Sequence, residues 1–278
     1  MCRKRNRKEE TAMKKIGFIG AGNMATAILN GVVSTKTYAP EYLFVYDVNP
    51  EKCHKMAEKG IGVLSSAAEL VDDCDVIFLA IKPQNFVEVL ESVRETVRKD
   101  KLFVTIAAGI STDFIKTTLQ CDCPVIRVMP NTPLLLGKGA TAMSRSSDVT
   151  DGQFALIQGF FAACGTVAVL DESKMNAIIS VNGSSPAYVY LFAKAMVDGA
   201  VQQGISADVA LPLVCQTLVG SAAMLMQPDT TPDALIKMVS SPGGTTLKAL
   251  DVLYDHQFEK TIQEAMEACT KRAEELGK

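Results

Sequence analysis

The sequence has little of what several classes of protein require. Only two histidines occur in 278 residues, and acidic residues outnumber basic ones by 31 to 28. The net charge of −3 lacks the basic excess of a nucleic-acid-binding surface, so we expect no nucleic-acid partner. Hydrophobic residues make up 48% of the chain, which excludes an intrinsically disordered protein.

The eight cysteines form no framework for disulfides or for a metal ion. They are spread along the chain, and Cys121 and Cys123 make the one close pair. A zinc ion on this pair would need further ligands, and His54 and His256 do not complete a set at the usual spacing. We therefore expect no metal site, and reduced thiols that fit a cytoplasmic protein.

The first residues, MCRKRNRKEETA, carry five basic and two acidic side chains and no apolar run. A secretory signal needs an apolar stretch after its basic residues, and none follows here. We expect residues 1–12 to be a disordered basic tail and the folded chain to begin at Met13.

One uncharged stretch, residues 209–228, is long enough to cross a bilayer. Pro212, Gln216 and Gly220 interrupt it, and no basic flank would set its orientation. A helix that is apolar nearly all round must be covered, either by its own domain or by a partner. We interpret the stretch as a helix covered by a second subunit, which predicts a homodimer and no membrane partner.

The first half of the chain alternates apolar runs with amphipathic stretches. Predicted strands cover residues 15–20, 42–47, 75–81, 102–108, 125–129, 139–144 and 166–170. Predicted helices cover residues 25–34, 50–60, 85–99 and 111–119. This alternation indicates an α/β domain with a doubly wound, mostly parallel sheet. After Leu170 only helical periodicity continues, which predicts an all-α second domain.

The strongest local motif is the glycine turn Gly20-Ala21-Gly22-Asn23-Met24, directly after the first predicted strand. Gly20 allows a tight turn, and Gly22 lets the backbone approach a pyrophosphate. The amides that open the following helix face the phosphates. The strand–turn–helix setting therefore predicts a Rossmann-type dinucleotide site.

Asp47 ends the second predicted strand, where an acidic residue usually hydrogen-bonds the ribose hydroxyls of NAD. Its carboxylate would repel the 2′-phosphate of NADPH, and the next residue is Val48, not an arginine. We expect NADH or NADPH as the cofactor, with NADH favoured. An alternative interpretation is that Asp47 only caps the turn at residues 49–51.

Two further segments end at the carboxyl edge of the predicted sheet, where ligands bind in open α/β folds. Lys82-Pro83 follows the third strand, and residues 107–109, Ala-Ala-Gly, follow the fourth. A lysine at a strand end is often simply solvated, and small residues also serve ordinary packing. For each segment, its position alone does not decide between ligand binding and these ordinary roles.

A second informative stretch, SSPGGTTL at residues 240–247, places glycines and threonines at the start of a predicted helix. Unpaired amides at such a start can bind a carboxylate, and the threonine hydroxyls add donors and acceptors. An ordinary capped helix start uses the same residue types. The chemistry of this stretch does not decide between a carboxylate site and an ordinary helix start.

The chain resembles pyrroline-5-carboxylate reductases over residues 14–275. The motifs that carry the resemblance are IGFIGAGNMATAI, AIKPQNF, RVMPNTP, NGSSPAYVY and VSSPGGTTLKAL. It implies a Rossmann domain followed by a helical dimerisation domain, with homodimers that assemble into larger rings. It also implies hydride transfer from NAD(P)H to C5 of 1-pyrroline-5-carboxylate, which gives L-proline in the last step of proline biosynthesis.

The resemblance assigns residues to the site as well. The cofactor contacts it implies are the glycine turn, Ile81, Lys82, Pro83, Ala108 and Asn131. The substrate contacts it implies are Glu172, Ser241, Gly243, Gly244, Thr245 and Thr246. It places the Thr246 hydroxyl on the ring nitrogen and the loop amides on the carboxylate. We expect Thr246 and Lys82 to be the catalytic residues.

These assignments divide the chain into a dinucleotide-binding domain, residues 13–170, and a substrate and dimerisation domain, residues 171–278. Two rival functions share parts of the pattern. A β-hydroxyacid-type dehydrogenase would carry a catalytic lysine early in the helix after residue 186, where Tyr188 and Tyr190 stand and Lys194 comes late. A non-catalytic NAD-binding module would keep the glycine turn but would not need SPGGTT.

Overall fold

The structure, a computed structural model, describes residues 13–277, so the predicted basic tail lies outside the described residues. The chain forms two compact units. The first runs to Gly183 and resumes at Thr270, and the second covers Ser184–Cys269. The first unit thus extends beyond the change of pattern at Leu170, because Asn182 donates hydrogen bonds to the carbonyls of Met129 and Ala140 in the sheet region.

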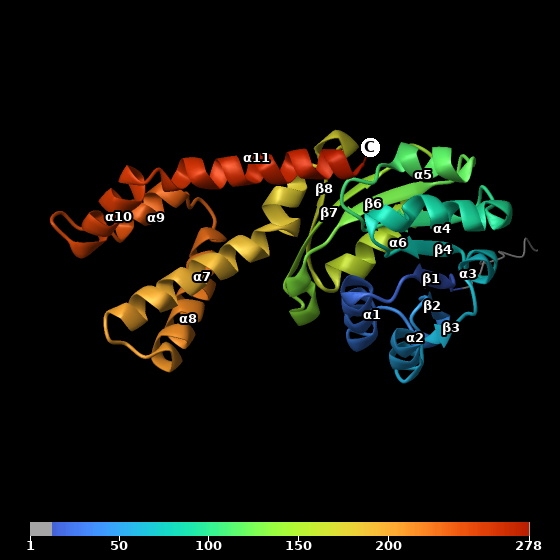
Figure 1. Cartoon of the computed structure of the whole chain (residues 1–278), viewed down its shortest axis with the longest axis horizontal. Helices are drawn as coiled ribbons and strands as arrows, with labels where there is room; N and C mark the ends of the chain where they lie inside the picture. Colours follow the sequence, from blue (N-terminus) through green and yellow to red (C-terminus); the bar gives the residue numbers. More distant parts are fainter. Residues whose placement is uncertain (1–12, 278) are drawn as a thin grey trace, which may run out of the picture. The chain divides into compact units, whose positions relative to one another are not determined.

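In the described residues the first unit holds one eight-stranded sheet, in the order β3-β2-β1-β4-β5-β6-β7-β8 (Figure 1). The strands are β1 Ile16–Ile19, β2 Leu43–Tyr46, β3 Gly62–Val63, β4 Val76–Leu79, β5 Leu102–Thr105, β6 Val125–Met129, β7 Gly139–Arg145 and β8 Gly165–Val169. Only the β6–β7 pair within this sheet is antiparallel. The predicted doubly wound, mostly parallel sheet is confirmed.

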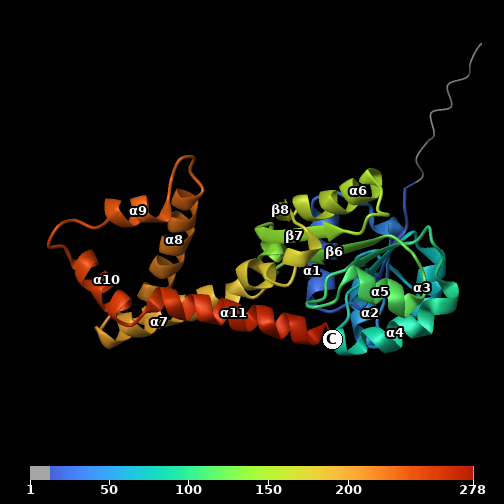
Figure 2. The ribbon, with the colours of Figure 1, turned by 90° about the horizontal axis from the view of Figure 1, so that it is seen from above.

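Helices cover both faces of this sheet (Figure 2). They are α1 Asn23–Ser34, α2 Pro50–Ala57, α3 Ala67–Asp73, α4 Phe86–Val93, α5 Thr112–Leu119 and α6 Asp151–Ala162. The helices α3 and α6 and the strand β3 were not predicted. Two residues of β3 show no periodicity, but α6 begins at a capping box between Thr150 and Gln153 that the sequence displays.

The strand pleat sorts the apolar residues into two cores. Ile16 and Phe18 of β1 lie in one core with α1 and α6, whereas Ile19 lies in the other with α3, α4 and α5. Because both faces are covered, nearly every residue of the central strands is apolar. The sheet is therefore a rigid support for the loops at its carboxyl edge.

The second unit is helical, as the periodicity after Leu170 predicted. Its helices are α7 Ser185–Gln202, α8 Ala207–Leu225, α9 Pro232–Met238, α10 Thr245–Asp255 and α11 Phe258–Leu276, whose last turns from Thr270 belong to the first unit. Within residues 13–277, α8 alone is long and apolar enough to cross a membrane, with 11% of its apolar window buried. Many large apolar side chains of this unit stay exposed, among them Val209 and Leu213 of α8.

Candidate dinucleotide and carboxylate sites

The two glycines of the turn after β1, Gly20 and Gly22, differ in whether the fold requires a glycine at that position. Gly20 has a φ of +100°, and a methyl group on it would lie 2.5 Å from the Ala80 carbonyl oxygen. Gly22 has an extended backbone, and a methyl group there would meet no atom within 4 Å. Neither backbone strain nor packing demands glycine at position 22. The open space in front of Gly22 therefore fits the close approach of a bound ligand, such as a pyrophosphate.

The start of α1 offers donors to an anion. Gly22 is the N-cap, no side chain caps the helix, and its first turn contains no acidic residue. The first amides of a helix have no partner within the helix, and its N-terminus carries a partial positive charge. The turn thus has both the space and the donors for a phosphate group.

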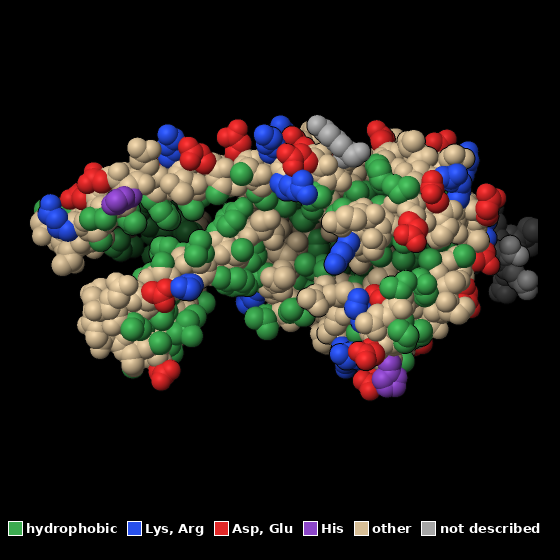
Figure 3. Space-filling view, viewed as in Figure 1, with side chains coloured by type: hydrophobic (Ala, Val, Ile, Leu, Met, Phe, Trp, Pro, Cys, Tyr) green, Lys and Arg blue, Asp and Glu red, His purple; other side chains and the backbone are tan. Residues whose placement is uncertain are grey.

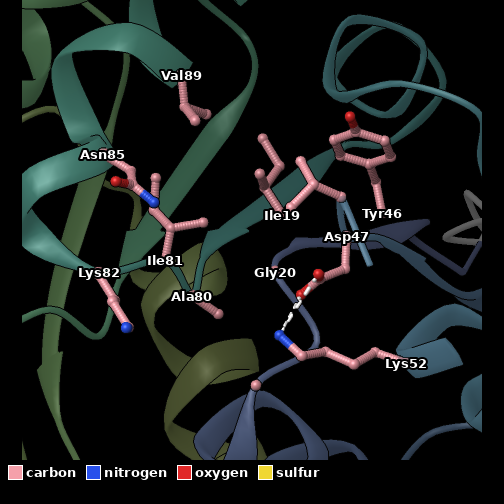
Figure 4. A pocket seen from close by; sticks show the side chains of 12 residues that line it. Ile19, Gly20, Tyr46, Asp47, Lys52, Ala80, Ile81, Lys82, Asn85 and Val89 are labelled. Atoms are coloured by element: carbon pink, nitrogen blue, oxygen red, sulfur yellow. Dashed lines mark hydrogen bonds and ion pairs between the residues drawn. The ribbon is translucent and has the colours of Figure 1, made fainter. Parts of the chain in front are cut away.

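A pocket of about 280 Å³ opens beside this turn, at the carboxyl ends of β1, β2 and β4 (Figure 4). It brings together predicted cofactor residues from distant parts of the chain: Gly20, Gly22, Asp47, Ile81 and Lys82. Sequence reasoning missed other lining residues, namely Tyr46, Val48, Lys52, Asn85 and Val89. Tyr46 and Val48 could have been found from their place at the end of β2, and Asn85 from its place soon after Lys82. Lys52 lies inside α2 and Val89 inside α4, so no strand-end signal indicated them.

Asp47 is held by backbone and side-chain donors. Its carboxylate oxygens accept hydrogen bonds from the amides of Ala21, at 2.8 Å, and Asn49, at 2.9 Å, and its side chain is 8% exposed. Lys52 Nζ lies 3.2 Å from the same carboxylate, as the dashed line in Figure 4 marks. Burial raises the pKa of Asp47, but these hydrogen bonds and the ammonium outweigh burial, so its pKa lies below the usual value. Asp47 thus caps the turn, and its contact with a ribose stays a prediction.

A second pocket, of about 590 Å³, shares Gly22 and Lys52 with the first and is also lined by Ala21 and Asn23. The other predicted cofactor residues line neither of these two pockets: Met24, Pro83, Ala108 and Asn131. The amide of Asn131 is already used, because it accepts from Ala140 N and donates to the Asn182 carbonyl. The cofactor roles of these four residues stay predictions.

Glu172 joins a partly buried network within the first unit. Its carboxylate accepts hydrogen bonds from the amide, at 2.7 Å, and the hydroxyl, at 2.6 Å, of Thr112, at the start of α5. Arg127 of β6 is 2% exposed, lies 3.8 Å from Glu172 and donates to Asn176. Burial lowers the pKa of Arg127, and the Glu172 carboxylate opposes that shift. In the structure Glu172 holds loops together, and its contact with a substrate stays a prediction.

The SPGGTT stretch lies in the second unit, where it forms the turn before α10 and the first two residues of that helix. Gly243 has a φ of +72°, and a methyl group on Gly244 would lie 2.6 Å from the Ser241 hydroxyl oxygen. Gly244 is the N-cap of α10, which starts without a side-chain cap and without an acidic residue in its first turn. The turn thus presents amide donors beside the hydroxyls of Thr245 and Thr246, an arrangement that suits a carboxylate.

Comparison with known proteins decides the family. Residues 172–276 match the family model described as "Pyrroline-5-carboxylate reductase dimerisation", and residues 15–109 match "NADP oxidoreductase coenzyme F420-dependent". The "Pyrroline-5-carboxylate reductase" of Escherichia coli is 39% identical over 95% of this chain and 99% of that protein. The chain belongs to the pyrroline-5-carboxylate reductase family. The predicted resemblance is confirmed, and residues 172–276 form a dimerisation domain of this family.

Other members of the family match this chain over nearly its whole length. "Pyrroline-5-carboxylate reductase 3" of Danio rerio is 35% identical over 95% of this chain and 91% of its own. The Plasmodium falciparum pyrroline carboxylate reductase, solved with NADP bound, superposes with a TM-score of 0.88 at 30% identity, over 95% of this chain and 98% of that one. A ketol-acid reductoisomerase at 14% identity, with a TM-score of 0.64, shares the fold alone.

Proposed function

We propose that this chain reduces 1-pyrroline-5-carboxylate to L-proline with NAD(P)H, as the last step of proline biosynthesis in the cytoplasm. The observation that carries the proposal is the 39% identity with the Escherichia coli reductase over 95% of the chain. The open turn at Gly22 and the uncapped starts of α1 and α10 support it, because each suits an anionic group of cofactor or substrate.

The first unit supplies the cofactor site. NAD(P)H, when bound, supplies the hydride. The amides of the glycine turn would hold its pyrophosphate, and Ile81 and Lys82 would line the nicotinamide side. Pro83, Ala108 and Asn131 are proposed as further cofactor contacts on the strength of the family motifs.

The second unit supplies most of the proposed substrate contacts. The amides around Ser241, Gly243 and Gly244 would bind the carboxylate, and the hydroxyls of Thr245 and Thr246 would face the ring. Glu172, in the first unit, is proposed as an additional substrate contact.

The reaction requires little acid–base chemistry from these residues. A cyclic imine accepts hydride well when its nitrogen is protonated, so the substrate can arrive as the iminium. No side chain then has to act as a general acid, and the protein contributes mainly by positioning C5 and fixing the carboxylate. Thr246 would orient the ring nitrogen, and Lys82 would fix the nicotinamide end.

The dimerisation domain supports a homodimer, and we propose that these dimers assemble into a larger ring. Exposed apolar side chains on α7 and α8 supply surface that a second subunit would cover.

The test of the activity is the loss of NADH or NADPH absorbance with 1-pyrroline-5-carboxylate and the purified protein. We expect oxidation that requires the substrate and is largely lost in Thr246→Ala. If neither cofactor is oxidised by a protein that demonstrably binds one of them, the chain shares the fold and acts on another substrate.

A further inference from the structure

The loop between β5 and α5, residues 106–111, lies beside the segment that carries Ile81 and Lys82. The strands β4 and β5 pair in parallel, with Leu79 opposite Thr105, so the two segments leave the sheet next to each other. Ile81 and Lys82 line the pocket beside the glycine turn. The strand order puts this loop and β2 on opposite sides of β1, and a dinucleotide extends across the carboxyl ends of such a sheet. The loop therefore belongs to the nicotinamide side of the proposed cofactor site.

Hydrogen bonds fix this loop at both of its ends. At its start, the hydroxyl of the buried Thr105 accepts from Ala107 N at 3.2 Å. At its end, Thr112 is the first residue of α5, so its amide has no partner within the helix. The Glu172 carboxylate accepts from that amide at 2.7 Å and from the Thr112 hydroxyl at 2.6 Å. A negative charge at a helix N-terminus is also favourable, so Glu172 suits this place.

The Glu172 carboxylate is held in turn from the sheet. Arg127 Nη1 lies 3.8 Å from it, and another nitrogen of the same guanidinium donates to Asn176 Oδ1. Arg127 is 2% exposed and lies in β6, directly opposite Thr105 of β5. The contacts from Arg127 to Glu172 and from Glu172 to Thr112 thus tie the end of the loop to the rigid sheet.

The middle of the loop is held by the last turns of α11. Ala273 and Gly277 are four residues apart and share one face of the helix, and a methyl group on Gly109 would lie 2.5 Å from the Ala273 carbonyl oxygen. Figure 3 shows acidic and basic side chains along the outer face of α11, whereas Ala273 is 3% exposed. Ala107 and Gly109 are both buried, and Ala108 between them is half-buried. The position of Ala108 is therefore set from three directions.

We propose that Glu172 is a positioning residue of the cofactor site, which acts through Thr112 and together with the end of α11 to hold Ala108 against the nicotinamide ring. The proposal rests on the proposed function, because it requires a nicotinamide dinucleotide at this edge of the sheet. It gives Glu172 a role on the cofactor that is independent of any contact with the substrate. That role operates before the substrate binds.

The test measures binding of the full-length protein by calorimetry without substrate. The probes are NADH with ADP-ribose, and NADPH with 2′-phospho-ADP-ribose, and the second member of each pair lacks the nicotinamide. In the pair that binds more tightly, the ratio of the two dissociation constants reports the contribution of the nicotinamide. We expect the intact cofactor to bind about tenfold or more tightly, because an enclosed ring contributes binding energy of that order.

Thr112→Val removes the hydroxyl and keeps the shape of the side chain. It should lower this ratio about threefold or more, because Glu172 loses a donor and the loop is held less closely. Thr112→Ser keeps the hydroxyl and should restore the ratio. Thr118→Val is the matched control, because it removes a hydroxyl of the same helix that donates to the Phe114 carbonyl, and it should leave the ratio unchanged.

Glu172→Gln keeps the size of the side chain and removes the charge that faces Arg127 and Thr112. It should lower the ratio as Thr112→Val does, while the affinity for the probe without nicotinamide changes by less than about twofold. The melting temperature of each variant shows whether it is folded.

Several outcomes would overturn the proposal. They are a wild-type ratio near one, no detectable binding of any probe, and unchanged ratios in folded Thr112→Val and Glu172→Gln. An equal loss of affinity for both members of a pair would show a general structural role and overturn it too. A Glu172→Gln variant that raises only the KM for 1-pyrroline-5-carboxylate would limit Glu172 to a substrate contact, against the proposal. A protein that shows the predicted ratios but oxidises neither cofactor with 1-pyrroline-5-carboxylate would keep this inference and refute the proposed function.

Discussion

Gly109 and Gly277 meet backbone to backbone. A methyl group on Gly277 would lie 2.2 Å from the Gly109 carbonyl oxygen, and one on Gly109 would lie 2.5 Å from the Ala273 carbonyl oxygen. The end of α11 therefore packs directly on the loop that follows β5. That loop contains Ala108, which the family motifs assign to the cofactor, so the last residues of the described chain support the proposed cofactor site.

Gly109→Ala should destabilise the protein more than Gly137→Ala. Both glycines have a positive φ, +82° and +67°, so alanine costs about 1 kcal/mol in backbone strain at either position. Only Gly109 also faces a backbone atom closer than 3.0 Å, whereas Gly137 faces open space. We expect a further loss of about 1–3 kcal/mol in the free energy of unfolding, measured with urea. Equal losses in the two variants would contradict the packing argument.

Gly22→Ala should weaken NAD(P)H binding by about tenfold or more while leaving stability nearly unchanged. The methyl group meets no protein atom, but it occupies space at the pocket beside the turn. Binding is measured by the fluorescence of the reduced cofactor. Gly152→Ala, which also faces open space but lies in α6, is the matched control and should bind the cofactor like the wild type. Unchanged binding in Gly22→Ala would refute the phosphate role of the turn.

Thr246→Ala should lower kcat without moving the acid limb of its pH profile. The hydroxyl is proposed to orient the ring nitrogen, and the substrate brings its own proton. Thr246→Ser keeps the hydroxyl and should recover most of the turnover. An acid limb displaced in the alanine variant would show instead that Thr246 takes part in proton transfer.

Asp47 should make the folded protein sensitive to acid. Its folded pKa lies below the usual value of 3.8, so its stabilising effect is complete above that pH and is lost as the pH falls through the folded pKa. Unfolding by urea at a series of pH values below about 5 should show a weaker pH dependence for Asp47→Asn than for the wild type. Parallel curves for the two proteins would refute this contribution.

Leu213→Lys should shift the protein from a dimer towards a monomer. Leu213 of α8 is 64% exposed within one chain, and a second subunit would cover it. Light scattering at micromolar concentration measures the mass of the assembly. Leu136→Lys, at a leucine that is 82% exposed in the first unit, is the matched control and should leave the dimer intact. A wild-type monomer under these conditions would contradict the role of α8.

Local pattern predicted the sheet well where the strands are apolar runs buried on both faces, as in β1 and β4. The antiparallel direction of β7 was not predicted, although residues 130–138 are too few for a helical crossover between β6 and β7. The two residues of β3 pair with β2 only because the sheet already exists. Such short elements depend on their neighbours more than on their own sequence.

The glycine turn, the SPGGTT stretch and the family resemblance could all be predicted before the structure, because each depends on residues that are adjacent in the chain. Which side chains line one pocket or form an ion pair depends on how the chain folds. Arg127 of β6 reaches Glu172 through the packing of segments that are distant in the chain. Lys52 reaches Asp47 across the turn between β2 and α2, where the fold directs both side chains to the same pocket. The burial of Arg127 and the donors on Asp47 set their pKa values, and both follow from the folded sheet.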